Sequence, residues 1–203
     1  MRRSSTRKTG SQNSASAMNS LPVDLFRSAS SKAIIKELER IEQLFSSYMN
    51  KSSGMIDPEG IEALCSDLEV DHTDVRTLML AWKMRAEKQG YFTLDEWRRG
   101  LKALRADTIN KLKKALPELE KEVRRSPNFV DFYSYAFQYC LTEEKQKSIE
   151  IDSICELLYL VLGSQFLAQV VLLNEYLKIQ NDYKVINMDQ WMGFLRFCNE
   201  KDE

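Results

Sequence analysis

The residue types that most often perform acid–base or nucleophilic chemistry are scarce in this sequence. His72 is the only histidine, and it lies in the polar run Asp71-His72-Thr73-Asp74 with no serine or cysteine nucleophile motif beside it. The sequence also contains no glycine-rich phosphate loop, nucleophile elbow, dinucleotide fingerprint or zinc-protease helix. We therefore interpret His72 as a surface turn residue. No catalytic residue is predicted, and we expect a non-enzymatic binding protein.

The four cysteines are the other candidates for chemistry. They are far apart in the sequence, form no CxxC pair, and occur at Cys65, Cys140, Cys155 and Cys198. Each lies among apolar residues with helical spacing, which is typical of buried, reduced thiols in a reducing compartment. One histidine and scattered cysteines do not make a metal-ligand pattern, so we predict no metal site.

The segment around Gly90 has the glycine and hydrophobe spacing of an EF-hand loop. Such a loop places oxygen ligands at positions 1, 3, 5 and 12, glycine at 6, and at 8 an aliphatic residue that pairs with the twin loop. With Gly90 at position 6, Phe92 falls at position 8 and Glu96 at position 12. Positions 1, 3 and 5 hold Arg85, Glu87 and Gln89. Because Thr93-Leu-Asp-Glu96 also forms a capping box, we interpret Glu96 as a helix cap and not as a ligand.

An earlier segment has the same skeleton. With Gly54 at position 6, Ile56 falls at position 8, but Met49, Lys51 and Gly60 occupy positions 1, 3 and 12. Calcium affinity rises with the number of carboxylate ligands, so we predict that neither loop binds calcium and that the protein carries no cofactor. Two chance glycine–hydrophobe matches are the alternative explanation of the pattern.

Apolar residues recur every three or four positions from Ala33 to the end of the chain, which predicts a series of amphipathic helices. The first stripe consists of Ile34, Ile35, Leu38, Ile41, Leu44, Phe45 and Tyr48. Further helices are expected over 60–68, 75–84, 94–104, 152–162 and 165–179. Three more are expected to start from a cap at Asp107, after Ser126-Pro127 and around Asn187. The helix that follows Asp107 is expected to break at Pro117. Seven glycines and four prolines are few for a chain of 203 residues, which also favours helices.

The predicted fold is all-α. Tandem EF-hand-like helix–loop–helix units without calcium are expected over about 33–106, followed by a C-terminal helical bundle over about 107–203. Residues 1–30 are basic and serine-rich, without an acid until Asp24, so we predict a disordered tail. The same composition fits a transit peptide or a nuclear-import patch. Residues 31–203 are expected to form one domain.

Charge and hydropathy exclude several classes of partner. With 29 basic and 30 acidic residues, the chain lacks the basic excess of a nucleic-acid binder. The most apolar run, residues 157–173, is interrupted by polar residues, so we expect no membrane span. No apolar stretch follows the basic start and Arg2 replaces the glycine of a myristoylation motif, so we expect a protein of the nucleus, the cytoplasm or both.

Seven short runs, in order, resemble the potentiating-neddylation domain of the defective-in-cullin-neddylation family. They are Gly60-Ile-Glu-Ala-Leu-Cys-Ser-Asp-Leu68, Leu80-Ala-Trp-Lys-Met-Arg-Ala86, Phe92-Thr-Leu-Asp-Glu96, Asp107-Thr-Ile-Asn-Lys-Leu112, Phe129-Val-Asp-Phe-Tyr133, Leu160-Val-Leu-Gly163 and Met188-Asp-Gln-Trp191. The resemblance extends from about Leu38 to the last residues. Their order and spacing make the match specific, although each run alone is weak.

The resemblance implies a co-ligase for cullin neddylation. Such a protein binds the neddylation-conjugating enzyme and the C-terminal domain of a cullin in a ubiquitin-ligase complex, and forms no covalent intermediate itself. Holding donor and acceptor together raises their effective concentration, which promotes transfer of the ubiquitin-like modifier to a cullin lysine. An EF-hand-like calcium-responsive adaptor is the alternative function.

In the family, an apolar pocket receives the N-acetylated methionine of the conjugating enzyme. The residues here that match its positions are Ile61, Leu78, Leu80, Ala81, Ala86, Gln89, Phe92 and Leu160, while Met84, Gly90 and Tyr139 replace the Phe, Cys and Phe of the family. Periodicity alone would equally place these side chains in a helical core. Acetylation should matter because burying a free ammonium in an apolar pocket costs on the order of several kcal/mol.

The resemblance also implies an acidic surface that faces the cullin near the C-terminus. Asp189, in Met188-Asp-Gln-Trp191, matches the first acid of that surface. An acid in the first turn of a helix is also favoured by the helix dipole alone. The closing Glu200-Lys-Asp-Glu203 does not resemble the rest of the family's segment, so we expect the domain to lack its C-terminal end and to bind cullin more weakly.

Overall fold

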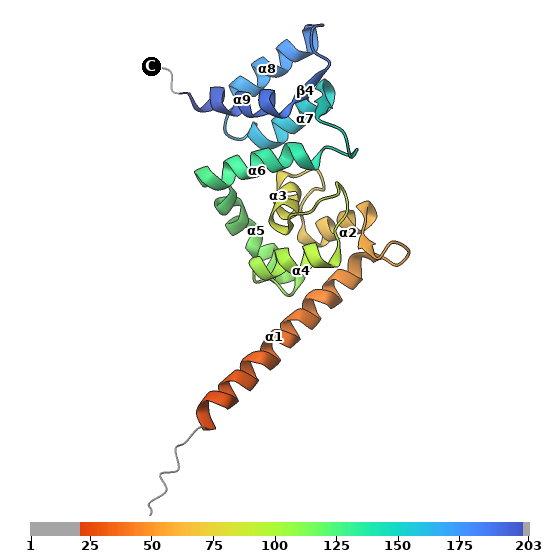
Figure 1. Cartoon of the computed structure of the whole chain (residues 1–203), viewed down its shortest axis with the longest axis vertical. Helices are drawn as coiled ribbons and strands as arrows, with labels where there is room; N and C mark the ends of the chain where they lie inside the picture. Colours follow the sequence, from red (N-terminus) through yellow and green to blue (C-terminus); the bar gives the residue numbers. More distant parts are fainter. Residues whose placement is uncertain (1–20, 201–203) are drawn as a thin grey trace, which may run out of the picture. The chain divides into compact units, whose positions relative to one another are not determined.

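The computed structural model describes the backbone of residues 21–200 and the side chains of residues 31–200 (Figure 1). The chain divides into two compact units, residues 1–36 and 37–203. The elements in chain order are α1 (Leu21–Tyr48), β1 (Met49–Asn50), β2 (Met55–Ile56), α2 (Pro58–Leu68), α3 (Val75–Met84), α4 (Leu94–Ala103), α5 (Ile109–Val123), α6 (Ser126–Tyr139), β3 (Ser148–Glu150), α7 (Ile151–Leu162), α8 (Leu167–Ile179), β4 (Val185–Asn187) and α9 (Met188–Asn199). The prediction of an all-α fold is confirmed.

Helix α1 begins at Leu21, earlier than the start near Ala33 that periodicity predicts. Pro22 stands in its first turn, where the missing backbone N–H costs no hydrogen bond. Of the tail expected over residues 1–30, residues 21–30 therefore lie in a helix, and residues 1–20 lie outside the described residues.

Fewer residues of the predicted apolar stripe of α1 are buried than its periodicity suggests. Ile34 and Ile35, in the first unit, are 55% and 53% exposed. Within the second unit, Ile41, Phe45 and Tyr48 are buried. Ile41 is fixed further because its carbonyl accepts a hydrogen bond from Trp97 Nε1 of α4 at 3.0 Å.

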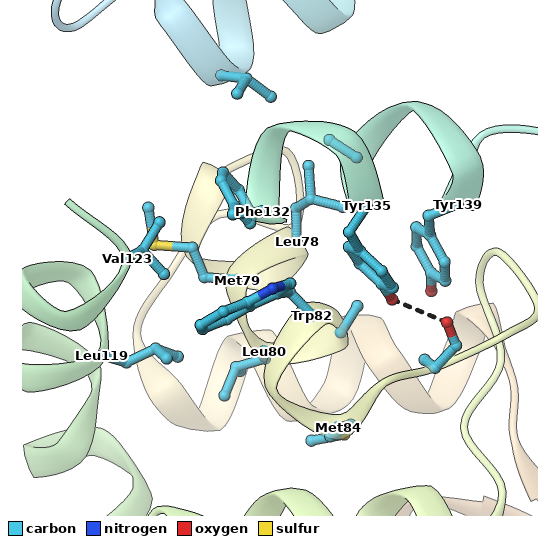
Figure 2. Packing of buried hydrophobic residues seen from close by; sticks show 14 of the residues in the cluster. Leu78, Met79, Leu80, Trp82, Met84, Leu119, Val123, Phe132, Tyr135 and Tyr139 are labelled. Atoms are coloured by element: carbon cyan, nitrogen blue, oxygen red, sulfur yellow. Dashed lines mark hydrogen bonds between the residues drawn. The ribbon is translucent and has the colours of Figure 1, made fainter. Parts of the chain in front are cut away.

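Helix α3 lies at the centre of the N-terminal half of the second unit. It packs against α4, α5 and α6 (Figures 1 and 2). Trp82 of α3 meets Phe132 of α6 edge to face, with ring centroids 6.2 Å apart. The Trp82 indole also donates a hydrogen bond to Asp131 at 2.7 Å, so this large side chain buries its rings without leaving an unpaired N–H.

The two loops that carry the glycine–hydrophobe pattern are joined by their backbones. Ile56 and Phe92, both placed at loop position 8, exchange two hydrogen bonds of 3.0 and 2.9 Å. Gly54 and Gly90 have φ of +70° and +77°, which favours glycine over other residues. The predicted capping box of Thr93 and Glu96 is confirmed. The pairing of position 8 is therefore as expected, while the description of the units as EF-hand-like stays a prediction.

The geometry of both loops opposes calcium coordination. A Cβ at Gly60, position 12 of the first loop, would lie 2.2 Å from the Tyr48 carbonyl oxygen, so no carboxylate side chain fits there. In the second loop, Glu96 Oε1 accepts a hydrogen bond from the Glu87 N–H and Oε2 from the Thr93 N–H, at 2.9 and 2.7 Å. Residues 31–200 contain no group of three or more His, Cys, Asp or Glu that could hold a metal ion.

Asp107 does not cap α5, contrary to the sequence-based prediction. Thr108 is the capping residue, and its hydroxyl accepts from the Lys111 N–H. Asp107 is buried instead, with Lys111 Nζ at 2.6 Å and Arg40 Nε at 2.8 Å. The ammonium of Lys111, followed by the guanidinium of Arg40, holds the pKa of the Asp107 carboxyl below its usual value. This pair of cations ties α1 to the start of α5.

Pro117 does not interrupt α5, which runs unbroken through it. The proline ring removes one hydrogen bond of the helix. Leu112, Leu116, Leu119 and Val123 are buried along one face on both sides of it, while Pro117 itself is exposed. Burial of this stripe offsets the missing bond.

Helix α6 connects the two halves of the second unit. The ring of Tyr133 in α6 stacks on Trp191 of α9, with the ring centroids 4.2 Å apart and an angle of 8° between the ring planes. The two residues also exchange hydrogen bonds, from Trp191 Nε1 to the Tyr133 carbonyl and from the Tyr133 hydroxyl to the Trp191 carbonyl. Helices α7 and α8 pack together beyond it, and β3 pairs with β4. Among the described helices, none is long and apolar enough to cross a bilayer.

The close approach of α2 to the end of α1 makes a testable prediction. We expect Gly60→Ala to lower the free energy of unfolding by about 3 kcal/mol, because the added methyl would overlap the Tyr48 carbonyl. Gly193→Ala is the matched control. A Cβ there meets nothing closer than Arg196 Nη2 at 3.6 Å, so alanine should stabilise α9 by up to about 1 kcal/mol. Urea unfolding of both variants measures the difference, and equal stabilities would contradict the packing described.

Candidate functional site

A cavity of about 280 Å³ opens between α2, α3, the loop that precedes α4, the end of α6 and α7. Gly90 lines it, and so do seven of the ten side chains predicted for the pocket: Ile61, Leu78, Ala81, Gln89, Phe92, Tyr139 and Leu160. These residues come from five separate segments of the chain. The structure thus brings together side chains that the sequence places up to a hundred positions apart.

The secondary structure explains how each wall is held. On α3, Thr77, Leu78 and Ala81 follow one another at helical spacing and face the cavity together. Phe92 is fixed from behind by its backbone pairing with Ile56. Leu160 lies on α7, beyond the aromatic helix α6. The pocket therefore exists only when both halves of the second unit are folded against α6.

Three predicted pocket residues do not line this cavity. Leu80, Met84 and Ala86 are buried and are not among the residues that line the cavity, so they belong to the core. Figure 2 shows Leu78 on the side of α3 that faces α6, whereas Leu80 and Met84 lie away from it. Met84 packs on α4, where a Cβ at Gly100 would lie 2.4 Å from its Cγ. Leu80 is turned away from Ala81 by one step of the helix, Met84 lies in the last turn against α4, and Ala86 follows the end of α3. The sequence runs alone cannot show these differences.

Tyr139 adds a hydroxyl to the pocket. This oxygen accepts a hydrogen bond from the Gly90 N–H at 3.1 Å, and the ring stacks on Tyr135 with centroids 5.3 Å apart. Figure 2 shows the two rings side by side on α6. Within residues 31–200, the Tyr139 O–H donates to no acceptor. Burial raises the pKa of Tyr139 to about 12, so the hydroxyl keeps its proton and can donate to a ligand.

Polar groups surround the mouth of the pocket. Gln89 is exposed there, and its side-chain amide forms no hydrogen bond within the described residues. His72 also lies at the rim, with Nδ1 3.7 Å from Asp71 Oδ1, and its side chain is 61% exposed. The interpretation of His72 as a turn residue therefore holds, but the sequence did not reveal its place at the rim.

Several further lining residues escaped the sequence analysis: Pro58, Glu62, Thr73, Asp74, Thr77, Cys140 and Leu157. A signal for Thr77 exists, because it precedes Ala81 by one helical turn. Leu157 similarly precedes Leu160 by nearly one turn on α7. Pro58, Thr73, Asp74 and Cys140 lie at turns or helix ends, and Glu62 follows Ile61 within α2. These residues could be found only after the helices were placed.

The pocket is not arranged for covalent chemistry. Cys140 is the thiol that lines it, and burial raises its pKa to about 11. A nucleophilic thiol requires the opposite, a pKa lowered by a neighbouring cation or base. Apolar walls with a few hydrogen-bonding groups suit the binding of a short apolar ligand.

Asp189 lies apart from the residues that line the pocket. It is exposed in the first turn of α9, where Asn187 and Gln190 form a capping box. Its place agrees both with a partner-facing acid and with a residue that stabilises the helix start through the dipole.

An all-helical fold with a small, largely apolar pocket is typical of a binding module. A family model described as cullin binding matches residues 111–203. DCN1-like protein 4 of Homo sapiens is 36% identical over 196 residues, which cover 94% of this chain and 66% of that protein. The chain belongs to this family of DCN1-like proteins, which confirms the resemblance found in the sequence.

Other relatives give the same result. DCN1-like protein 4 of Danio rerio is 38% identical over 143 residues, covering 70% of this chain and 50% of that protein. DCN1-like protein 3 of Pongo abelii is 32% identical over 197 residues, covering 95% and 64%. The chain thus spans between half and two thirds of the length of these relatives.

The division between core and pocket can be tested by truncating one residue of each kind. Leu80→Ala should lower the free energy of unfolding by about 3 kcal/mol, because it leaves a cavity in a closed core. Leu160→Ala should cost about 1 kcal/mol, because this half-buried side chain borders space that is already open. Urea unfolding measures the free energy of unfolding of both variants. A larger loss of stability for Leu160→Ala than for Leu80→Ala would contradict the assignment of Leu80 to the core and Leu160 to the pocket.

Proposed function

We propose that this protein is a non-catalytic co-ligase for cullin neddylation. Its pocket holds the N-acetylated methionine of the neddylation-conjugating enzyme, while another surface binds a cullin. The observation that carries the proposal is the pocket itself, which is lined by seven of the residues that the family resemblance implies. Two further findings support the proposal: the chain belongs to the DCN1-like family, and residues 111–203 match a cullin-binding family model.

The size and lining of the pocket fit a single chain end. Its volume of about 280 Å³ lies at the lower limit of ligand pockets, too small for a folded element but adequate for one long side chain with an acetyl group. Ile61, Leu78 and Phe92 offer apolar contact to a methionine thioether. An unbranched, flexible methionine adapts well to such an irregular wall.

The polar groups favour an acetyl amide over a free amine. The Tyr139 hydroxyl can donate to the acetyl carbonyl, and the Gln89 side chain can pair with the first peptide group. Two carboxylates line the pocket. Asp74 is already bound by Arg76, with Oδ2 2.6 Å from Nη2, and Glu62 is exposed to water, where its attraction for an ammonium is weak. A free N-terminus would have to give up its hydration with little compensation.

Binding of the second partner is proposed for the C-terminal half of the chain. The cullin-binding family model covers α5 to α9 in large part, and Asp189 presents a carboxylate on the exposed start of α9. The co-ligase would accelerate transfer by holding enzyme and cullin in one complex, which raises the effective concentration of the acceptor lysine. No group of this chain needs to form a bond with the modifier.

Peptide binding tests the pocket directly. Fluorescence anisotropy would compare an N-acetylated peptide from the conjugating enzyme with the same peptide carrying a free amine. We expect the acetylated form to bind at least about 100-fold more tightly, because desolvation of the ammonium costs several kcal/mol. Tyr139→Phe should weaken the acetylated form by about 2- to 10-fold and leave the free amine unchanged. Equally weak binding of both peptides would contradict the assignment of the pocket.

A reconstituted modification reaction tests the whole proposal. With the conjugating enzyme, the modifier and a cullin present, the full chain should raise the initial rate of cullin modification. Ile61→Ala should reduce that gain by about 10-fold at limiting protein, because it removes apolar contact worth about 1–2 kcal/mol. Lys51→Ala, in the exposed turn between β1 and β2, is the matched control and should have no effect. An unchanged cullin rate with the full chain would refute the co-ligase role.

A further inference from the structure

Helix α8 exposes a row of apolar side chains on the outside of the second unit. Leu172, Tyr176 and Ile179 are 67%, 48% and 79% exposed. Their spacing of four and then three residues places these side chains on one face of the helix. Figure 1 shows α8 at the outer edge of the second unit, with α7 and α9 between it and α6. The opposite face of α8, with Val170 and Leu177, is buried, so the exposed row points away from the core.

This row continues into an apolar hollow of about 410 Å³ between α7, α8, β4 and α9. Tyr176 belongs to both the row and the hollow. Tyr183 and Phe197 also line the hollow, and they are 47% and 59% exposed. We call the combined surface the α8 face and define it by Leu172, Tyr176, Ile179, Tyr183 and Phe197.

The α8 face is large for an apolar surface that stays in contact with water. Its five large side chains, each about half exposed or more, present roughly 500 Å². Apolar patches of this size on a soluble protein often mark an interaction site. Two such faces placed together would bury roughly 1,000 Å², which is near the lower limit of a specific protein interface.

The charges beside the row fit a second copy of the same face. Glu175 and Lys178 are exposed on one edge of the row, and neither forms an ion pair within residues 31–200. When two identical helices lie antiparallel about a two-fold axis, equal edges meet. Glu175 of each copy can then lie opposite Lys178 of the other, so the face is complementary to itself in charge.

The same register interlocks the apolar side chains. If residue 175 of one copy lies opposite residue 178 of the other, residue 179 lies opposite residue 174. Position 174 is midway between Leu172 and Tyr176 along the helix. Ile179, the most exposed residue of the α8 face, would therefore enter the space between these two side chains of the second copy.

We propose that the α8 face is the interface of a symmetric homodimer in which the two α8 helices lie antiparallel. Leu172, Tyr176 and Ile179 form its apolar centre, and Glu175 and Lys178 fix the relative direction of the helices. No residue of the α8 face lines the pocket between α2, α3, α6 and α7. The dimer is therefore independent of the function proposed for that pocket.

Sedimentation velocity of the full chain over a range of protein concentrations tests the dimer. We expect a reversible monomer–dimer equilibrium with a Kd on the order of 100 μM, because an interface of this size binds weakly. The double variant Leu172→Gln, Ile179→Gln should raise the Kd by at least about 100-fold, because four apolar side chains lose their burial across the two-fold axis. Glutamine keeps a high helix propensity, and circular dichroism and urea unfolding check that the variant is folded.

The matched control is the double variant Ile34→Gln, Ile35→Gln. These two isoleucines of α1 are 55% and 53% exposed and lie outside the α8 face. The control should leave the Kd unchanged, although it replaces as many exposed apolar side chains.

A charge exchange tests the antiparallel register. Glu175→Lys or Lys178→Glu alone would place like charges opposite each other twice in the dimer. Each should therefore raise the Kd by about 5-fold or more at low ionic strength. The double variant Glu175→Lys, Lys178→Glu restores opposite charges and should return the Kd to that of the unchanged chain.

The other outcomes contradict the proposal. A chain that stays monomeric at every concentration overturns the dimer and leaves the α8 face to a different protein or to residues 1–20. A dimer that persists in the Leu172→Gln, Ile179→Gln variant, or that is lost in the control, overturns the α8 face as the interface. A dimer that the charge exchange fails to restore overturns the antiparallel register.

Discussion

Everything in the second unit depends on the burial of α6 from two sides. Phe132 and Tyr135 face the N-terminal half, where Phe132 meets Trp82 and the Tyr135 hydroxyl donates to the Ala86 carbonyl at 2.9 Å. Tyr133 faces the C-terminal half and stacks on Trp191. A helix with aromatic residues on both faces is stable only when both faces are buried, because exposing either face to water costs free energy in proportion to its apolar area. The two halves must therefore fold onto it together.

This constraint also places the binding surfaces. The end of α6 carries Tyr139 and Cys140 to the point where α3, the loop before α4 and α7 converge. Of these two, Cys140 also lines a larger cavity along α7 and β3, which shares Gln89, Leu157 and Leu160 with the pocket. The helix that joins the two halves of the second unit therefore also positions the boundary between these two cavities.

The sequence predicted most helices and seven pocket residues because periodicity and short motifs depend on neighbours along the chain. It failed where the outcome depends on distant residues. Asp107 was predicted to cap α5, but Thr108 does so, while Asp107 pairs with Lys111 and with Arg40, which lies 67 positions away. Likewise, Met84 resembles a pocket residue in sequence but is drawn to α4, because Gly100 leaves space for it there. The pocket combines five separate segments, so no local sequence pattern reveals all of it.

Cys140 gives the junction of the two cavities a distinct chemical character. A thiol whose pKa is raised to about 11 is ionised in only about one molecule in ten thousand at neutral pH. Alkylating reagents and peroxides attack the thiolate, so this cysteine should react slowly although it borders open space. An electrophilic ligand would therefore form a covalent bond with Cys140 only slowly. A ligand at this junction must bind through its shape and its polar contacts.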